Sequence, residues 1–343
     1  MIEIDGSYLE GGGQIIRTAI ALSAITQKGV HIFNIRKGRE KPGLRPQHLE
    51  GIKASAKICN AKAEGLYLDS MEVKFTPGKL RGGEFTIDTK TAGSVTLILQ
   101  TLVPQGICAE SPLNLSIKGG TAVPFSPTID YFQHVFCHWL KKIGVSIWVD
   151  VRRHGFYPKG GGEILVKIEP GKIKNINLSE RGKLQKIDVL SVASNHLKDA
   201  KVAERMIDGF RKTLPEANTK FQYVDTVSPG CFIRSHAHFE NGKLGADALG
   251  KPGKKAEQVG EEAARELKKA IDHNTPIESW MVDQIIPYIA LATVETKEIS
   301  KVKIPHLTKH AETNIWVVKK FLSVDFEIKN SIMICNAISN NIM

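Results

Sequence analysis

One of the eleven histidines in the chain lies where chemistry on phosphorus is favoured. His310 stands directly before the run Ala311-Glu312-Thr313-Asn314-Ile315-Trp316, at the expected start of the last helix. An imidazole at that place can hold a covalently bound phosphate whose negative charge faces the free N–H groups of the helix. An ordinary histidine at a helix start is the alternative, and the pattern alone leaves both open.

A glycine-rich loop near the amino terminus is the second candidate. Glu10-Gly11-Gly12-Gly13-Gln14 precedes a predicted helix, and glycine lets backbone N–H groups approach an anion at a helix start. The loop has neither the Lys-Ser/Thr of a P-loop nor the spacing of a dinucleotide-binding fold. A phosphate cradle and a plain tight turn therefore both remain open. A second loop, Lys159-Gly160-Gly161-Gly162, joins two predicted strands, where a structural turn is favoured.

A basic segment follows the second predicted strand. Five cations fall within the ten positions from Arg36 to Arg45, in a loop that leads into a helix. Arginine guanidinium groups match phosphate oxygens in bidentate geometry, and Arg17 on the first predicted helix could converge on the same anion. The net charge of +11 also favours an anionic partner such as RNA, DNA or a nucleotide. A solvated basic surface is the alternative.

Most of the other histidines are expected to be structural. His236 and His238 share one face of a predicted strand, which would suit a metal ion. No nearby acidic residue or cysteine completes a ligand set in the sequence, so a metal site is not favoured. His134 and His138 lie four apart on a helix, in a region whose aromatic residues indicate core. The chain also lacks a serine nucleophile elbow, an HExxH motif and a kinase signature.

The elements that must position these residues recur in a fixed order. Strands over 1–5, 30–35 and 71–75 alternate with helices over 15–25 and 46–59, and a similar series runs from Gly83. In that second series Ser126 is the expected N-cap of a helix that ends at Gly144. The region 184–276 breaks the order, which resumes with helices over 281–291 and 311–322 and strands over 301–304 and 326–329. We expect three similar units, the third interrupted by an inserted domain.

Composition sets outer limits on these hypotheses. A chain of 343 residues with 42% hydrophobic and 24% charged residues is typical of a folded protein of about two domains. No apolar run is long enough to span a membrane, and the amino terminus does not resemble a signal peptide. We therefore expect a cytoplasmic protein without a membrane partner. The five cysteines are expected to be reduced thiols, without disulfides or structural zinc: Cys59, Cys108, Cys137, Cys231 and Cys335.

Taken together, the motifs resemble those of the RNA 3′-terminal phosphate cyclases, over nearly the whole chain. Each piece is short, but their joint order is specific. The resemblance is carried by Asp5-Gly6, Glu10 to Arg17, Ile35 to Arg39, Pro42-Gly43-Leu44, Gln47-His48-Leu49, Ala92-Gly93-Ser94, Gln100-Thr101, Gly119-Gly120-Thr121, Pro127, Asp130, His154 to Gly162, Asp283-Gln284 and His310 to Asn314.

The resemblance implies an α/β fold with three repeated βαβαβ units like the C-terminal domain of translation initiation factor 3. These units form a large catalytic domain over 1–183 and 277–343, and a smaller α/β domain over 184–276 is inserted in the third. Nothing functional is carried onto the insert, which matches the family poorly. A homodimer is compatible with the family, but no pattern in the sequence supports one.

The resemblance also implies a reaction. The family nucleophile aligns with His310, which attacks the α-phosphate of ATP and forms a histidine–AMP. AMP then passes to the 3′-phosphate of an RNA, and the vicinal 2′-hydroxyl closes the 2′,3′-cyclic phosphate and expels AMP. In the matching positions, Arg17, Arg36, Arg39 and Gln47 would hold RNA phosphates, the three arginines would also act in catalysis, and Glu10 would contact Mg²⁺ or Mn²⁺. Six residues besides His310 would bind the nucleotide: Gln100, Pro127, Tyr131, Trp280, Asp283 and Gln284.

A rival interpretation comes from the same fold. Some relatives are ribosome-assembly proteins that lack the catalytic histidine and bind RNA or protein partners. His310 and the three arginines are present here, which favours the enzyme. A nucleic-acid-binding module without chemistry would explain the charge and the basic loop, but it would not explain Trp280, Asp283 and His310 together.

Overall fold

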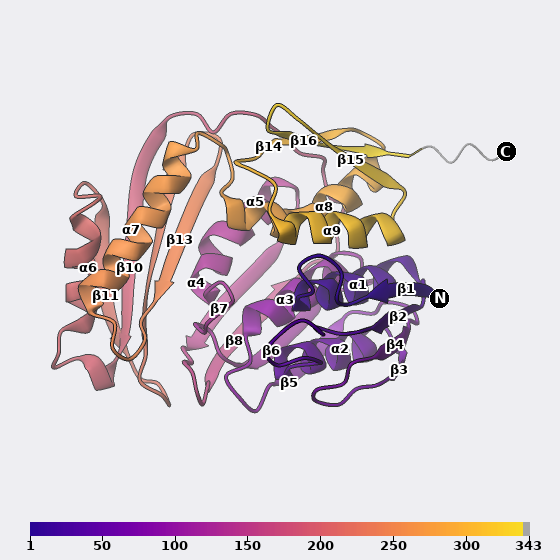
Figure 1. The fold of residues 1–343 in the computed structure, drawn as a ribbon, viewed down its shortest axis with the longest axis horizontal. Helices are drawn as coiled ribbons and strands as arrows, with labels where there is room; N and C mark the ends of the chain where they lie inside the picture. The colour runs from indigo at the N-terminus through magenta and orange to yellow at the C-terminus, as the bar shows by residue number, and fades with distance from the viewer. Residues whose placement is uncertain (339–343) are drawn as a thin grey trace.

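A computed structural model describes residues 1–338 of the chain. Its first unit is a four-stranded sheet with two helices, and Figure 1 shows it in indigo. The sheet order is β1-β2-β4-β3, in which β1 and β2 are parallel and the other pairs are antiparallel. The elements are β1 (Ile2–Asp5), α1 (Gly13–Thr26), β2 (Val30–Phe33), α2 (Pro46–Ile58), β3 (Lys62–Glu64) and β4 (Val73–Thr76).

Two further sheets repeat this topology. The second has the order β5-β6-β8-β7 and the third β9-β14-β16-β15, each with one parallel pair followed by two antiparallel pairs. The second unit comprises β5 (Gly83–Asp88), α3 (Val95–Ile107), β6 (Leu113–Gly119), α4 (Ile129–Tyr131), a π-helical turn (Phe132–Phe136), α5 (Cys137–Lys142), β7 (Ile147–Arg153) and β8 (Gly162–Ile168). The third comprises β9 (Asn177–Leu178), α8 (Ser279–Thr296), β14 (Ser300–Lys303), α9 (Lys309–Phe321), β15 (Val324–Lys329) and β16 (Ile332–Ala337).

The α/β class is confirmed, and the repeat unit needs a correction. Each unit closes with two antiparallel strands, so its order is β-α-β-α-β-β rather than βαβαβ. Short strands such as β3 and β9 carry too few residues for an alternating pattern, which is why they were not predicted.

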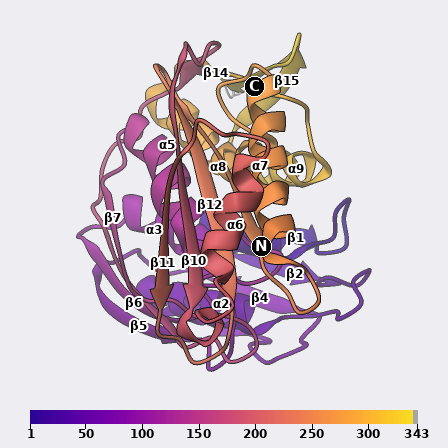
Figure 2. The ribbon, with the colours of Figure 1, turned by 90° about the vertical axis from the view of Figure 1, so that its left-hand side faces the viewer.

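Between β9 and α8 the chain forms a separate sheet with the order β11-β10-β12-β13. Alternation along its strands gives it two buried faces. One face packs against helices α6 and α7, which lie side by side in the foreground of Figure 2. The other face packs toward the second unit, where Val192 and Phe232 join Ala122 and Phe156 in a small apolar cluster. The elements are β10 (Leu184–Ser194), a short 3₁₀ turn (Asn195–Leu197), α6 (Val202–Arg211), β11 (Asn218–Val224), β12 (Cys231–Phe239), β13 (Lys243–Leu249) and α7 (Ala256–Asp272).

The helix after β6 begins later than predicted. Its N-cap is Thr128 rather than Ser126, because the Thr128 hydroxyl accepts the N–H of Tyr131 at 3.1 Å. The Ser126 hydroxyl instead donates to the carbonyl of Val123 at 3.1 Å. The expected single helix is also divided by the π-helical turn, a feature that often accompanies functional sites.

Two further expectations concern the whole chain. All five cysteines are free thiols, as predicted, although Cys108 is exposed. Within residues 1–338, none of the helices is both long enough and apolar enough to cross a membrane. The last five residues of the predicted large domain, 339–343, lie outside the described part of the chain.

The fold brings the first and third units together at the candidate site. Helix α9 lies against α1 in Figure 1, and Thr18 of α1 donates to the Asn314 side-chain oxygen of α9 at 2.6 Å. Helix α8 packs beside α9, and the Asn314 amide donates to the backbone carbonyl of Asp283 at 2.6 Å. Polar contacts thus hold three helices from distant parts of the sequence, α1, α8 and α9, against one another.

Candidate active site

His310 is the second residue of α9, which is capped by Thr308 through a 3.1 Å hydrogen bond from the Ala311 N–H. Its Nδ1 lies 2.9 Å from the side-chain oxygen of Gln14. A carbonyl oxygen only accepts, so this contact assigns the imidazole proton to Nδ1 and leaves a lone pair on Nε2. The side chain is 43% exposed. His310 thus combines a fixed tautomer with an accessible side chain.

The surroundings of His310 keep it neutral. Partial burial lowers its pKa below the ordinary value, Arg17 and Arg39 lower it further, and Glu10 opposes them. A neutral imidazole is the form that attacks phosphorus. At neutral pH the neutral form of His310 therefore predominates.

Gln14 is held in one orientation by a second contact. Its amide nitrogen donates to Asp283 Oδ2 at 3.0 Å, so its oxygen must face His310. Burial raises the pKa of Asp283 to about 7, while Arg17 and the Gln14 contact lower it. The contacts from Asp283 to Gln14 and from Gln14 to His310 therefore set the tautomer of His310. Gln14 belongs to the glycine loop, but its role could not be predicted from the sequence, since its partners lie 269 and 296 positions away.

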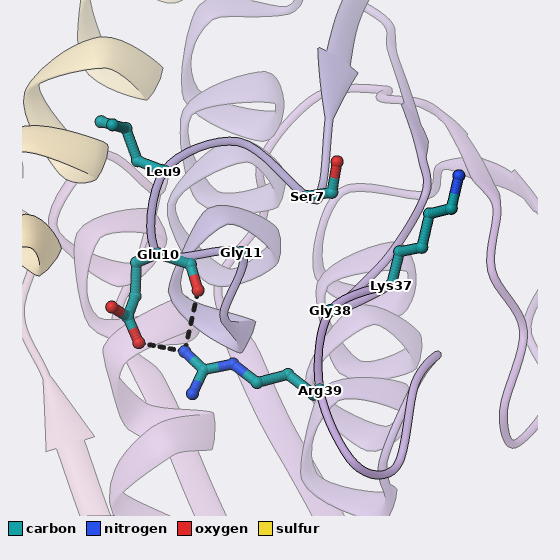
Figure 3. A pocket seen from close by; sticks show the side chains of 7 residues that line it. All are labelled: Ser7, Leu9, Glu10, Gly11, Lys37, Gly38 and Arg39. Carbon is teal, nitrogen blue, oxygen red and sulfur yellow. Dashed lines mark hydrogen bonds and ion pairs between the residues drawn. The ribbon is translucent and has the colours of Figure 1, made fainter.

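Glu10 and Arg39 stand at the exposed edge of His310. Glu10 Oε1 lies 3.6 Å from His310 Nε2. The Arg39 guanidinium donates to the Glu10 backbone carbonyl at 2.9 Å and pairs with its carboxylate. Figure 3 shows these two contacts across a pocket of about 480 Å³ between the glycine loop and the basic loop. It is lined by Ser7, Leu9, Glu10, Gly11, Lys37, Gly38 and Arg39.

The other predicted phosphate-binding residues are placed differently from one another. Arg17 is held among the three helices, and its Nε is buried without a hydrogen-bond partner within residues 1–338. Burial lowers its pKa to about 10, so it stays charged at neutral pH. Arg36 has a left-handed φ of 53°, and its guanidinium donates to the carbonyls of Lys41 (2.6 Å) and Gly43 (3.0 Å). Arg36 therefore stabilises the conformation of its own loop. Gln47 is half-buried in the first turn of α2.

A buried histidine beneath the glycine loop was not assigned a role from the sequence. The His48 Nδ1 accepts the Arg45 N–H at 3.1 Å. A Cβ on Gly13 would lie 2.1 Å from His48 Nε2, so only glycine fits at the first position of α1. Burial and the cations Arg17 and Arg36 lower the pKa of His48 well below its ordinary value. His48 is thus a neutral support for the loop.

Some of the predicted nucleotide-binding residues come together. The Gln100 amide donates to the Gln284 side-chain oxygen at 3.2 Å, and the Gln284 amide donates to the carbonyl of Trp280 at 2.8 Å. Trp280 is 64% exposed and offers an aromatic face. Pro127 precedes α4, and its carbonyl accepts the Thr96 hydroxyl at 2.9 Å.

Tyr131 does not present a ring face to solvent. It is 3% exposed, and its hydroxyl donates to Glu278. The inserted sheet covers it, because a Cβ on Gly245 would lie 2.9 Å from its ring. The sequence predicted a flat group against adenine, and the structure places this ring in the core. Phe125, in contrast, is fully exposed two residues before Pro127 and was not predicted.

The cluster around His236 corrects another expectation. Asp188 of β10 lies opposite His236 in register, and the ligand atoms of Asp188, His236 and His238 lie within 4.8 Å of one another. The missing acid therefore comes from the neighbouring strand. Arg234 donates to His236 Nδ1 at 2.6 Å, however, and Lys186 pairs with Asp188 at 2.7 Å. Arg234 thus occupies the Nδ1 lone pair of His236, and Lys186 already neutralises the charge of Asp188.

A tautomer-fixed histidine at a helix start, beside a carboxylate and arginines, is an arrangement that can carry out phosphoryl or nucleotidyl transfer. Comparison with known proteins narrows that class. The family model for RNA 3′-terminal phosphate cyclase matches residues 8–328. The chain belongs to this family.

Individual relatives agree over nearly their full length. Each of three is named RNA 3′-terminal phosphate cyclase. The one from Pyrococcus furiosus is 43% identical over 97% of this chain and 96% of its own. The one from Methanosarcina acetivorans is 40% identical over 96% and 97%, and the one from Methanopyrus kandleri 42% over 96% and 95%. Among solved structures, the enolpyruvyl transferase NikO from Streptomyces tendae matches 50% of this chain and 33% of its own at 16% identity. The TM-score of this match is 0.30, which is too low to support a conclusion about this chain.

Proposed function

We propose that this protein is an ATP-dependent RNA 3′-terminal phosphate cyclase that acts through a covalent His310–AMP. The observation that carries the proposal is the hydrogen bond from His310 Nδ1 to Gln14, which leaves Nε2 free to attack. Family membership and the names of the relatives support ATP and RNA as substrates.

In the first step, Nε2 forms a bond to the α-phosphorus of ATP, and the bond from that phosphorus to the bridging oxygen breaks to release pyrophosphate. A 3′-phosphate oxygen of the RNA then attacks the same phosphorus and displaces the imidazole, giving an RNA-(3′)pp(5′)A end. Last, the vicinal 2′-hydroxyl attacks the 3′-phosphorus and its proton passes to water, while the bond from that phosphorus to the bridging oxygen breaks and releases AMP. Developing negative charge in the first two steps falls beside Arg17 and Arg39, which are close enough to His310 to lower its pKa.

In this proposal Arg36 and Gln47 shape and line the phosphate-binding side, and Trp280 stacks on adenine. Gln100, Asp283 and Gln284 hold the nucleotide by their polar groups, and Pro127 and the buried Tyr131 complete the wall behind it. Exposed aromatic rings bind bases through their π faces. The proposal assigns 1–183 and 277–343 to the catalytic domain and 184–276 to the insert, and the two main apolar cores fall on either side of that division.

Glu10 would hold a divalent cation. Its carboxylate stands 3.6 Å from the nucleophilic nitrogen at the edge of the phosphate pocket, and Mg²⁺ or Mn²⁺ commonly binds to one carboxylate together with substrate phosphates. Such a cation neutralises charge on a transferring phosphoryl group.

An end-group assay tests the proposal. An internally labelled RNA with a 3′-phosphate is incubated with ATP and Mg²⁺ and then treated with phosphatase. The proposal predicts an end that resists phosphatase, requires the terminal 2′-hydroxyl, and is absent with His310→Ala but present with His306→Ala. His306 is an exposed histidine four positions away and is the matched control. An end that stays phosphatase-sensitive with the wild-type chain would contradict the proposal.

A further inference from the structure

The pocket next to His310 is lined by Lys37, a lysine to which the proposed function gives no role. Three of the five cations in the basic loop are already bonded: Arg36 to loop carbonyls, Arg39 to Glu10 and Arg45 to Asp69. Lys37 and Lys41 have no hydrogen bond or ion pair through their ammonium groups within residues 1–338. Of these two, Lys37 lines the pocket and Lys41 does not.

The pocket walls are held in place before any ligand binds. The Asp5 carboxylate accepts the backbone N–H and the hydroxyl of Ser7 at 2.9 and 2.7 Å, and the Asn34 amide at 3.3 Å. It thereby joins the start of the glycine loop to the start of the basic loop. A Cβ on Gly38, which also lines the pocket, would meet no atom within 4 Å. Figure 3 shows the Arg39 side chain extending toward Glu10, whereas the Lys37 side chain points away from that pair.

An aromatic pair adjoins the pocket. Tyr8 lies between two pocket residues, Ser7 and Leu9, and its ring stacks on Trp316 at 4.2 Å with an interplanar angle of 23°. Tyr8 is 40% exposed, and Leu9 beside it is 50% exposed. Trp316 belongs to α9, the helix that carries His310. A stacked pair with an accessible face is the usual platform for an unpaired base.

The direction of the nucleophile indicates which substrate enters here. His310 Nε2 faces Glu10, a pocket residue, whereas Nδ1 faces Gln14 and, through it, helix α8. In an in-line displacement the attacking oxygen approaches phosphorus from the side opposite the leaving group. A phosphorus atom bound to Nε2 would therefore be attacked from the pocket.

We propose that this pocket is the binding subsite for the 3′-terminal nucleotides of the RNA, with Lys37 holding an internucleotide phosphate and the Tyr8–Trp316 pair stacking on a base. The inference rests on the proposed function, because it assumes that AMP is carried on His310. It adds two binding residues, Lys37 and Tyr8, and a direction of entry.

The two half-reactions separate the inference from the function. The protein is first labelled by ATP without RNA, and discharge of the label is then followed at increasing concentrations of 3′-phosphorylated RNA. Lys37→Ala is expected to raise the half-saturating RNA concentration by about tenfold. Losing one phosphate contact should also reduce the slope of the logarithm of RNA affinity against the logarithm of salt concentration by about 0.7. Lys41→Ala, from the same loop and equally exposed, is the control and should change neither quantity comparably.

A second pair of variants tests the platform. Tyr8→Ala is expected to raise the half-saturating RNA concentration by about fivefold to about a hundredfold, and Tyr8→Phe, which keeps the ring, to restore it. An RNA that lacks a base at its last or penultimate position tests the same contact without altering the protein. It should bind the wild-type chain more weakly but lose little further with Tyr8→Ala. The rate of labelling by ATP alone shows that each variant is folded.

Each outcome decides the matter. Equal effects of Lys37→Ala and Lys41→Ala would overturn the subsite in favour of a diffuse basic surface. Normal RNA saturation with Tyr8→Ala, or equal loss of affinity for the abasic RNA in both chains, would overturn the platform. A wild-type chain that accepts no label from ATP would overturn the proposed function and this inference with it. If every variant accepted the label from ATP and passed it to RNA as the wild type does, only the inference about the pocket would be overturned.

Discussion

Replacing Gln14 by glutamate should move the pH dependence of the first chemical step. The substitution keeps an acceptor 2.9 Å from His310 Nδ1 but makes it an anion. The neighbouring Asp283, with a pKa already raised to about 7, can take up a proton and relieve the repulsion between the two carboxyl groups. His310 then faces a new negative charge that favours its protonated, non-nucleophilic form.

The magnitude follows from the fraction of neutral imidazole. In the wild-type chain the pKa of His310 lies below its ordinary value of 6.5, so more than about three-quarters of it is neutral at pH 7. An opposite charge at hydrogen-bonding distance raises a pKa by about one to three pH units. A rise of that size moves the pKa of His310 toward or through neutral pH and lowers the neutral fraction, so labelling at pH 7 should slow by up to about tenfold.

The assay is the initial rate of protein labelling by ATP, without RNA, between about pH 6 and about pH 9.5. Gln14→Glu should be slow at neutral pH and approach the wild-type rate at the alkaline end. Gln14→Met, which removes the hydrogen bond without adding charge, should lower the rate by about two- to tenfold at every pH. If Gln14→Glu ran parallel to the wild type across the range, Gln14 would not control the proton on Nδ1, and the tautomer explanation would be refuted.

Three other predictions concern the junction with the insert. Burial raises the pKa of Glu278 from 4.5 to about 7, so its neutral form stabilises the fold fully below about pH 4.5 and this contribution is lost as the pH rises toward 7. The free energy of unfolding should be measured by chemical denaturation between about pH 4.5 and about pH 7. Over this range the value for the wild type should fall by up to about 3 kcal/mol relative to that for Glu278→Gln. If the two values changed in parallel with pH, Glu278 would not be the group that titrates. Gly245→Ala places a Cβ 2.5 Å from Val135 Cγ2 and should cost about 1–3 kcal/mol; calorimetry would show the lower melting temperature, and an unchanged one would mean that the sheet moves freely. Asp247 accepts the backbone N–H of Thr128 at 2.8 Å, so Asp247→Ala should raise the KM for ATP by about two- to tenfold with little change in that for RNA, whereas equal changes in both would point to general unfolding.

Local patterns singled out His310 and the glycine loop as candidates, because helix starts and glycine turns depend on nearby residues. The pattern alone left an ordinary histidine and a plain turn open, and their expected roles came from the family resemblance. The α/β class and the three units followed from the alternation of strand and helix signals. The prediction of Ser126 as N-cap was wrong, because serine and threonine both form caps and only tertiary packing favours Thr128 here.

Contacts between distant residues could not be found in this way. Gln14 and His310 are 296 positions apart, and nothing near either one indicates the other. Asp188 faces His236 only because β10 and β12 pair in one register. Tyr131 had the residue type of a nucleotide-binding aromatic, but burial by the inserted sheet depends on a domain whose sequence pattern was not informative.

The proposed function requires Nε2 of His310 to become covalently attached to AMP. It is tested most directly by incubating the protein with Mg²⁺ and ATP that carries radioactive phosphorus at the α-position, followed by denaturing electrophoresis. We predict label on the wild type and on His306→Ala, none on His310→Ala, and a bond that survives alkali but breaks in acid. A wild-type chain that binds ATP yet acquires no label, or label that persists in His310→Ala, would contradict the account.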